Sequence, residues 1–358
     1  MYHMNKYTYY DGTKLLSLKD ISGNQPEIYI VSGNRSAGKT TYFSRLLVKR
    51  FINKGYKFAL IYRFSKELKD VSDKFFRDIS ALFFPTYTMK DLPRANGAFR
   101  ELFLINKADP GDNGVSCGYA VSLNSADEIK KYSHFFKDVK TMFFDEFQSE
   151  TNHYCPNEVN KLISVHVSMA RGDGDLVRYL PLYMCSNSVS MLNPYFSAFK
   201  LNNRISKNTN FVRGEGFVFE QTFNEDASAA QKESGFIKAF NNNNYIQYAT
   251  ENIYLNDNLA FVEHMKGDNK YLLTIRCNNT DYAIRQYISD GIIYCDDNVD
   301  VTFKDKICVT TNDLNINYVM LKQNDYYITT LRAYFSKGCF RFKNLDCKNA
   351  VLTLLSYY

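Results

Sequence analysis

The sequence predicts a mainly parallel α/β domain followed by a smaller α+β domain. Apolar runs of strand length alternate with segments of helical apolar spacing in the first part of the chain. This alternation is typical of a parallel sheet that is covered by helices on both faces. Short strand-like runs joined by turn residues follow in the second part, as in an antiparallel meander. All seven prolines occur in the first part, so the composition also changes near residue 200.

The first part is expected to contain short strands and amphipathic helices. The expected strands are 27–32, 57–63, 102–106, 142–144 and 180–185, and the expected helices are 41–54, 66–84 and 157–170. The remainder of 92–118 contains glycines and prolines that are typical of loops. We therefore expect one domain over residues 1–200.

The second part is expected to begin after a connector. Residues 201–231 contain asparagine-rich and small-residue stretches, which are typical of a linker or lid. The remaining domain is 232–358, with expected strands at 260–264, 271–277, 282–288 and 291–294 and expected helices at 315–334 and 345–357. Short strands mixed with helices in this way favour an α+β fold.

Composition and charge narrow the class of protein. The 358 residues are 45% hydrophobic, as in ordinary globular domains, and the apolar runs are far shorter than a membrane span. The N-terminus lacks the features of a signal peptide, and the eight cysteines form no CxxC pair. We therefore expect a cytoplasmic protein with reduced cysteines and no membrane partner.

The two parts of the chain differ in charge. Residues 1–200 carry 27 Lys and Arg against 20 Asp and Glu, a net charge of +7, whereas the rest has a net charge of −1. This modest basic excess favours a polyanionic partner.

Residues 33–40, with the sequence GNRSAGKT, form a complete phosphate-binding loop. The loop follows an expected strand and begins an expected helix, which is the context that this motif requires. Its backbone amides and the helix N-terminus would surround the β-phosphate of ATP. Lys39 would contact the β- and γ-phosphates, and Thr40 would bind Mg²⁺. The residues expected to bind the nucleotide are Gly33, Asn34, Arg35, Ser36, Ala37, Gly38, Lys39, Thr40 and Thr41.

Two carboxylates follow the apolar strand at 142–144. Asp145 would hold the Mg²⁺ ion, and Glu146 would polarise the attacking water. An apolar run that ends in acids is weak evidence alone, but here it follows a complete phosphate loop. A glutamate directly after the aspartate distinguishes a hydrolase of the additional-strand class from a kinase. The sequence therefore predicts an additional-strand P-loop ATPase.

Several polar residues are candidates for coupling hydrolysis to movement. Asn187 follows an expected strand and would sense the γ-phosphate. Arg171 would reach into the site of a neighbouring subunit if the protein forms a ring, with Arg178 as the second choice. Arg35 is either a sensor of the γ-phosphate or of a neighbour, or a solvated loop side chain. Tyr62 and Arg63, at the end of the second expected strand, are candidate contacts to the nucleotide or to a neighbour.

Several blocks of the sequence resemble the DNA-packaging ATPases of phi29-like small podophages. They are the phosphate loop with its internal arginine, FDEF at 144–147, YCPNEV at 154–159 and SNSVSMLNPYF at 186–196. TNDLN at 311–315 and the stretch 324–342, which ends in GCFRF, extend the resemblance over nearly the whole chain. The first two blocks are shared by many ATPases, whereas the third and fourth are much more specific.

The resemblance implies an ATP-driven motor that moves double-stranded viral DNA into a preformed procapsid. It also implies a homo-oligomeric ring, expected to be a pentamer, that docks on the portal (connector) vertex in the host cytoplasm. A packaging RNA is a further implied partner. Arg171 aligns with the family's trans-acting arginine and Glu146 with its catalytic glutamate. Residues 232–358 would form a reduced RNase H-like domain.

The second domain departs from a working nuclease of that fold. Such a nuclease gathers carboxylates around two metal ions, one of them from the middle of the first strand. The strand expected near 270–278 carries Arg276 and no acid. We therefore expect a module that contacts nucleic acid and has no nuclease activity.

Two other functions are compatible with the same residues. Another ring-shaped nucleic-acid translocase, such as a helicase, would open strands, whereas a packaging motor should respond to intact duplex. A nucleotide-gated assembly scaffold would not turn over ATP, and the presence of both Lys39 and Glu146 argues against it.

Overall fold

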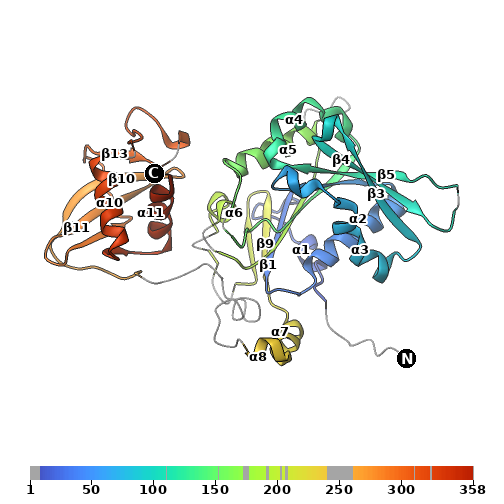
Figure 1. Cartoon of the computed structure of the whole chain (residues 1–358), viewed down its shortest axis with the longest axis horizontal. Helices are drawn as coiled ribbons and strands as arrows, with labels where there is room; N and C mark the ends of the chain where they lie inside the picture. The colour runs from blue at the N-terminus through green and yellow to red at the C-terminus, as the bar shows by residue number, and fades with distance from the viewer. Residues whose placement is uncertain are drawn as a thin grey trace. The chain divides into compact units, whose positions relative to one another are not determined.

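The protein folds into two compact units, residues 1–256 and 257–358 (Figure 1). The computed structural model describes residues 9–109, 111–151, 153–171, 177–190, 193–201, 204–205, 209–239, 261–309, 311–322 and 325–357. The division between the units lies C-terminal to the connector that we expected at 201–231. The reason is that the whole range 201–231 belongs to the first unit.

A nine-stranded sheet forms the centre of the first unit. Its order is β3-β4-β5-β2-β6-β7-β1-β9-β8. The strands are β1 (Ile28–Gly33), β2 (Lys57–Tyr62), β3 (Tyr87–Arg94), β4 (Phe99–Asn106), β5 (Val115–Ser122), β6 (Val139–Asp145), β7 (Leu182–Asn187), β8 (Phe211–Gly214) and β9 (Phe217–Thr222). The six strands from β5 to β9 in this order are parallel, and antiparallel strands flank them at both edges. The expected mainly parallel sheet is confirmed.

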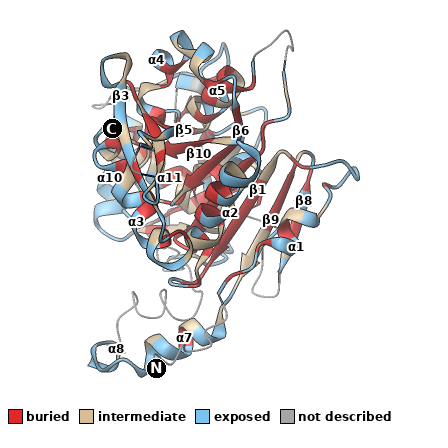
Figure 2. Cartoon of the chain, turned by 90° about the vertical axis from the view of Figure 1, so that its right-hand side faces the viewer, coloured by how far each residue is buried: buried red, intermediate tan, exposed pale blue. Residues whose placement is uncertain are grey.

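Helices cover both faces of this sheet. They are α1 (Thr13–Ser17), α2 (Lys39–Lys54), α3 (Val71–Phe83), α4 (Ala126–Lys131), α5 (Glu158–Ala170) and α6 (Pro194–Ala198). Two further helices, α7 (Glu225–Glu233) and α8 (Gly235–Ala239), follow β9. Successive strand residues enter different cores: Tyr29 and Val31 pack with α1, α2 and α3, whereas Ile30 packs with α4, α5 and α6. Burial on both faces explains why the central strands are apolar throughout (Figure 2).

β7 lies between β1 and β6. β1 precedes the phosphate loop and β6 ends in the two carboxylates, so β7 is the strand that defines the additional-strand class. The predicted fold class of the first unit is therefore confirmed.

Two expectations for the first unit were wrong. Residues 211–222, expected to belong to a connector, form β8 and β9, and β9 pairs in parallel with β1 along its whole length. The segment 92–118, expected to be mostly loops, contributes parts of β3, β4 and β5. Both errors arose because pairing with an existing sheet edge stabilises strands whose local sequence is weakly patterned.

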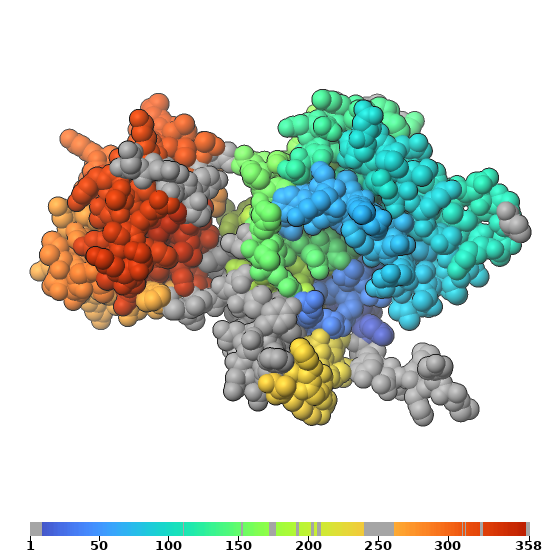
Figure 3. All heavy atoms as spheres, in the orientation of Figure 1, coloured from blue at the N-terminus to red at the C-terminus, as the bar shows by residue number. Residues whose placement is uncertain are grey.

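After β9, α7 and α8 (yellow) protrude at one edge of the unit (Figures 1 and 3).

The second unit is an α+β fold around a five-stranded sheet, as expected. Its order is β13-β10-β11-β12-β14. Its elements are β10 (Lys270–Cys277), β11 (Thr280–Tyr287), β12 (Ile292–Asp296), β13 (Lys306–Cys308), α10 (Tyr326–Ser336), β14 (Phe340–Phe342) and α11 (Leu345–Tyr357). The first three strands form the antiparallel meander that the turn residues predicted. The core contains side chains from the sheet, α10 and α11.

The helix expected at 315–334 was wrong in its first half, because α10 begins at Tyr326. Asp325 accepts a hydrogen bond from the Tyr327 amide and so caps the helix at this point. In the strand expected at 260–264, residue 260 lies outside the described residues, and Val262 makes an isolated bridge to Phe342. Each of the eight cysteines is a free thiol. Among the described residues, no helix is both long and apolar enough to cross a lipid bilayer.

Candidate active site

The phosphate loop joins the carboxyl end of β1 to the first residue of α2. The structure explains why two positions of this loop are glycine. A side-chain carbon on Gly33 would lie 2.3 Å from the carbonyl oxygen of Thr222 in β9, so the close parallel strand requires glycine. Gly38 has a φ of 89°, in the left-handed region that favours glycine. The amides at the start of α2 are left without helical partners and can bind an anion.

Lys39 is the buried cation of this loop. Its side chain is buried, and its Nζ donates to the carbonyl oxygens of Asn34 at 2.7 Å and Gly33 at 3.3 Å. It also reaches Oδ1 of Asn187 at 3.5 Å. Burial lowers the pKa of Lys39 to about 8, although the nearby Asp145 acts in the opposite direction. Lys39 is thus held in the loop with a charge that an incoming phosphate would stabilise.

Asp145 ends β6 directly opposite the start of α2. Its Oδ1 accepts hydrogen bonds from the hydroxyl of Thr40 at 3.1 Å, the thiol of Cys185 at 2.9 Å and the Glu146 amide at 2.9 Å. Burial raises the pKa of Asp145. A hydroxyl and a carboxylate oxygen side by side form the donor set that Mg²⁺ prefers beside nucleotide phosphates, so Thr40 and Asp145 fit this ion.

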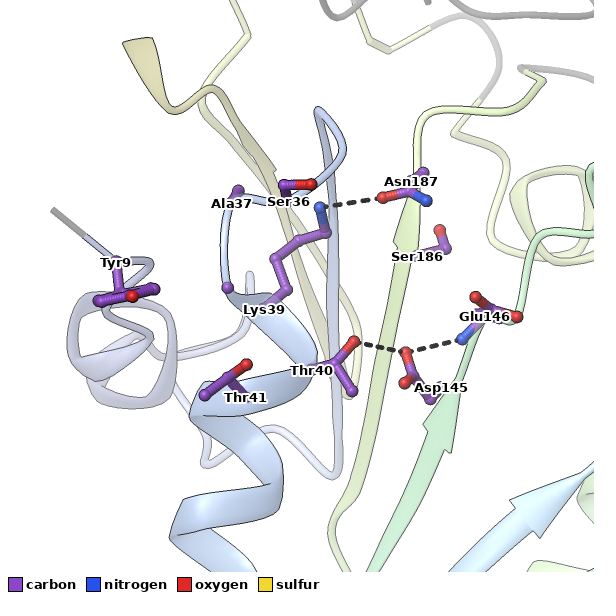
Figure 4. A pocket seen from close by; sticks show the side chains of 11 residues that line it. Tyr9, Ser36, Ala37, Lys39, Thr40, Thr41, Asp145, Glu146, Ser186 and Asn187 are labelled. Carbon is purple, nitrogen blue, oxygen red and sulfur yellow. Dashed lines mark hydrogen bonds between the residues drawn. The ribbon is translucent and has the colours of Figure 1, made fainter. Parts of the chain in front are cut away.

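Glu146 leaves the strand in a left-handed conformation, with a φ of 53°. Left-handed backbone is uncommon for residues other than glycine and is often found at functional sites. The turn brings Glu146 to the lining of the pocket, on the same side as Asn187 (Figure 4). Partial burial and the adjacent Asp145 raise the pKa of Glu146, which brings it closer to the range of a general base at neutral pH.

Asn187 is the last residue of β7, and its Cα pairs with Gly33 of the phosphate loop. The position of β7 between β1 and β6 therefore brings Asn187 beside Lys39. One pocket collects most of the predicted residues from these three strand ends (Figure 4), but Gly33, Asn34 and Arg35 do not line it. It is lined by Tyr9, Ser36, Ala37, Gly38, Lys39, Thr40, Thr41, Asp145, Glu146, Ser186 and Asn187.

Arg63 does not line this pocket, although its guanidinium donates to the backbone carbonyl of Glu146 at 3.4 Å. Its burial argues against the interpretation of Arg63 as a direct contact to the nucleotide or to a neighbour. It is buried and forms an ion pair with Glu158 at 2.9 Å. Its guanidinium also donates to the Phe147 carbonyl at 2.8 Å, and the Tyr195 hydroxyl donates to Glu158 at 2.7 Å. Glu158 and Tyr195 come from the YCPNEV and SNSVSMLNPYF blocks, so these two blocks meet at Arg63. The cluster fixes the chain that follows Glu146.

The two candidate trans-acting arginines have different environments. Arg171 follows the last residue of α5 and is exposed in a second hollow, which it lines with Lys130, Ser133 and Ser168. The Arg178 side chain instead donates to the backbone carbonyls of Val139, Phe136 and Met169. Arg178 therefore stabilises the first unit through these hydrogen bonds. Arg171 is the better candidate for contact with a neighbour, because its side chain is exposed.

Three residues of the phosphate loop make contacts that the sequence did not predict. Arg35 forms an ion pair with Glu150 at 3.0 Å, with both side chains partly exposed. The buried Asn34 exchanges two hydrogen bonds with the backbone of Asn224, at 3.0 and 2.9 Å. Ser36 accepts a hydrogen bond from Gln231 of α7 at 2.9 Å. The loop is therefore connected directly to α7, within the range where we expected a lid.

Sequence reasoning did not predict three side chains of this site, namely Cys185, Ser186 and Tyr9, and Ser186 and Tyr9 line the pocket. Cys185 is buried in β7, and burial raises the pKa of its thiol, so it remains protonated and donates to Asp145. Tyr9 lines the pocket from the beginning of the described chain. Its sequence context is a polar, tyrosine-rich segment, and no local pattern predicted its proximity to the phosphate loop.

Comparisons with known proteins show the family of the chain and proteins of similar fold. The family model described as "Podovirus DNA encapsidation protein (Gp16)" matches residues 4–357. The DNA packaging proteins of Bacillus phages phi29 and PZA are each 28% identical over 355 residues, which cover 98% of this chain and 98% of each relative. A chain of the bacteriophage Phi-29 viral genome packaging motor assembly has a similar fold, with a TM-score of 0.62 and 23% identity over 98% of this chain and 97% of that chain.

Proposed function

Because the chain belongs to the family of podovirus DNA encapsidation proteins, we propose that it is an ATP-driven motor that moves double-stranded viral DNA into a preformed procapsid. The observation that carries the proposal is the single pocket that joins Lys39, Asp145 and Glu146. Lys39 and Asp145 account for nucleotide binding, and Glu146 adds the group that hydrolysis needs.

In the proposed reaction, Glu146 accepts a hydrogen bond from the water that attacks the γ-phosphate and takes up its proton. Lys39 offsets the negative charge that develops on the phosphate oxygens. Thr40 and Asp145 would hold a Mg²⁺ ion, which would neutralise charge on the β- and γ-phosphates. The loop amides of residues 34–40 orient the phosphates, and Thr41 follows them at the start of α2.

Asn187 is proposed to report the loss of the γ-phosphate, because it lies at the end of β7 and contacts Lys39. Movement would then reach α7 through the contacts of Asn34 with Asn224 and of Ser36 with Gln231. In a homo-oligomeric ring, Arg171 would enter the neighbour's pocket and stabilise the charge of the transition state. Its exposure outside its own nucleotide pocket supports this assignment.

The second unit is proposed to be a reduced RNase H-like module that contacts nucleic acid without cutting it. Its acids support this proposal because several pair with cations: Asp281 with Arg276, Asp296 with Arg285 and Asp297 with Lys343. A two-metal nuclease would instead need such carboxylates to converge on one point.

The proposed partners follow from the function. They are double-stranded DNA, the portal of the procapsid and a packaging RNA, and the ring is proposed to be a pentamer. DNA would be contacted through its phosphate backbone, because a packaging motor must act on any sequence. The proposed location is the host cytoplasm, with transient docking on the portal vertex.

The test is ATP turnover by the purified chain with and without blunt double-stranded DNA, beside Lys39→Ala as the inactive control. Turnover that duplex stimulates, and that Lys39→Ala abolishes, would support a duplex-driven motor. Stimulation by single strands together with strand opening would favour a helicase instead. Binding of ATP without turnover, even with DNA, procapsids and RNA present, would favour an assembly scaffold and contradict the proposal.

A further inference from the structure

The nucleotide pocket has an end that the phosphate chemistry does not use. Tyr9 lines this end beside Ala37, Gly38 and Thr41, whereas Glu146 lies at the opposite end (Figure 4). A side-chain carbon on Gly38 would lie 3.0 Å from Cδ1 of Tyr9. The aromatic ring is therefore directly against the second glycine of the phosphate loop.

The direction of a bound nucleotide follows from its covalent order. The γ-phosphate would lie among Lys39, Asn187 and Glu146, and the β-phosphate at the amides that begin α2. The α-phosphate, ribose and base must then extend away from Glu146. That direction leads past Thr41 to Tyr9.

Tyr9 is held at this place by its neighbour Tyr10. The Tyr10 amide donates to the Ala37 carbonyl of the phosphate loop at 2.8 Å, and its hydroxyl donates to Glu220 at 2.6 Å. The Tyr10 ring is buried against Tyr42 and Phe43 of α2. With Tyr10 anchored in the core, the Tyr9 side chain remains 61% exposed at the mouth of the pocket.

We propose that Tyr9 is the stacking platform for the base of the bound nucleotide. This inference rests on the proposed ATPase function and adds the residue that binds the base. An exposed, anchored aromatic ring presents a flat apolar face at low entropic cost, and a base would cover it. Stacking on an aromatic side chain tolerates every base because each has a π-face, so Tyr9 should contribute similarly to the binding of ATP and GTP.

The absence of tryptophan from the chain makes a direct test available. A Tyr9→Trp variant would carry one tryptophan, whose emission reports on this position alone. Addition of ATP or ADP should quench it, whereas inorganic tripolyphosphate should compete with ATP without comparable quenching. The matched control is Tyr56→Trp, an exposed position beyond the far end of α2, about 24 Å along a helix of this length, where no nucleotide should change the emission.

Affinity provides the second measurement. By calorimetry, Tyr9→Ala should weaken ATP binding about tenfold, as expected for the loss of one base-stacking contact, whereas Tyr9→Phe should change it less than about twofold. Equal ATP affinity in Tyr9→Ala and the parent chain would overturn the proposal. Quenching of Tyr9→Trp by tripolyphosphate as strongly as by ATP would also overturn it, because the signal would then not depend on the base.

These results are separable from a failure of the proposed function. If duplex-stimulated turnover is normal and the Tyr9 variants bind ATP like the parent, only the base platform is wrong. If Tyr9→Trp responds to ATP as expected but no turnover occurs with DNA, procapsid and RNA, the base platform stands and the motor function is wrong.

Discussion

Acidic side chains have opposite environments in the two units. Asp145 and Glu146 face a pocket, and burial raises the pKa of both. In the second unit, Asp281 and Asp296 each pair with an arginine of the same sheet, at 2.7 Å. Among the described residues, Asp145 and Glu146 form no direct ion pair and so are available for chemistry, whereas the paired acids stabilise a sheet. The comparison therefore supports the proposal that catalysis belongs to the first unit and that these acids of the second unit support its sheet.

The largest expected effect concerns Glu146. Glu146→Gln should lower ATP turnover about 10³-fold, because a general base contributes roughly 10²–10⁴-fold, while ATP binding persists. The measurement is steady-state turnover beside calorimetric binding. Glu150→Gln is the matched control, since this nearby acid is paired with Arg35 and its loss should cost no more than a fewfold change. A comparable loss of ATP turnover in both variants would contradict the role of Glu146 as the general base.

A second prediction concerns the buried ion pair between Arg63 and Glu158 in the first unit. Glu158→Ala should lower the free energy of unfolding by about 3–5 kcal/mol, because it leaves the buried Arg63 charge without its partner. Chemical denaturation, followed by a probe in the first unit, measures this change. A loss below about 1 kcal/mol would indicate that water reaches Arg63 in the variant and that the cluster is not a rigid support for the segment after Glu146.

The third prediction uses pH to examine the cation of the pocket. A polyphosphate should bind the protonated form of Lys39, and its pKa is about 8 in the free protein. ATP affinity should therefore be near its maximum below pH 7 and should fall about fivefold between pH 8 and pH 9. Calorimetry at constant ionic strength measures this decline. A constant affinity up to pH 9 would show that Lys39 stays fully charged before ATP binds.

The smallest expected effect belongs to the second unit. The Arg276–Asp281 pair is about one quarter exposed on each side, so solvent screens it. Asp281→Asn should cost at most about 1 kcal/mol of unfolding free energy and leave ATP turnover unchanged. Denaturation and turnover assays check these two outcomes. A loss of turnover would break the comparison, because it would give an acid of the second unit a role in the ATPase cycle.

The active site was largely predictable from the sequence because its signals are local. Residues 33–40 must form a tight anion-binding loop, and consecutive acids after an apolar strand must emerge at the strand end. Where neighbouring parallel strands end is also constrained, and Asn187, predicted as a sensor of the γ-phosphate, lies 3.5 Å from Lys39. The chemical roles of these residues remain proposals that the experiments above test.

Long-range contacts were not predictable in the same way. Nothing in the local sequence distinguishes Arg63 and Arg178 from surface arginines. In the structure, however, each donates hydrogen bonds within the first unit, Arg63 to Glu158 and Arg178 to the Phe136 carbonyl. The residues of β8 and β9 were predicted to belong to a connector, because these strands are stabilised by pairing with the neighbouring edge of the sheet and not by their local sequence. Tyr9 enters the site only because Tyr10 packs against α2.

The amino-acid sequence by itself determined the fold class, the phosphate loop and the pair of acids, since backbone geometry and periodic burial act within a few residues. The tertiary structure decided which polar residues share the pocket and which stabilise the fold. Asn34 and Asn224, for example, are separated by 190 residues and meet across the phosphate loop. Such partners are selected by the packing of whole strands and helices, which no local pattern specifies.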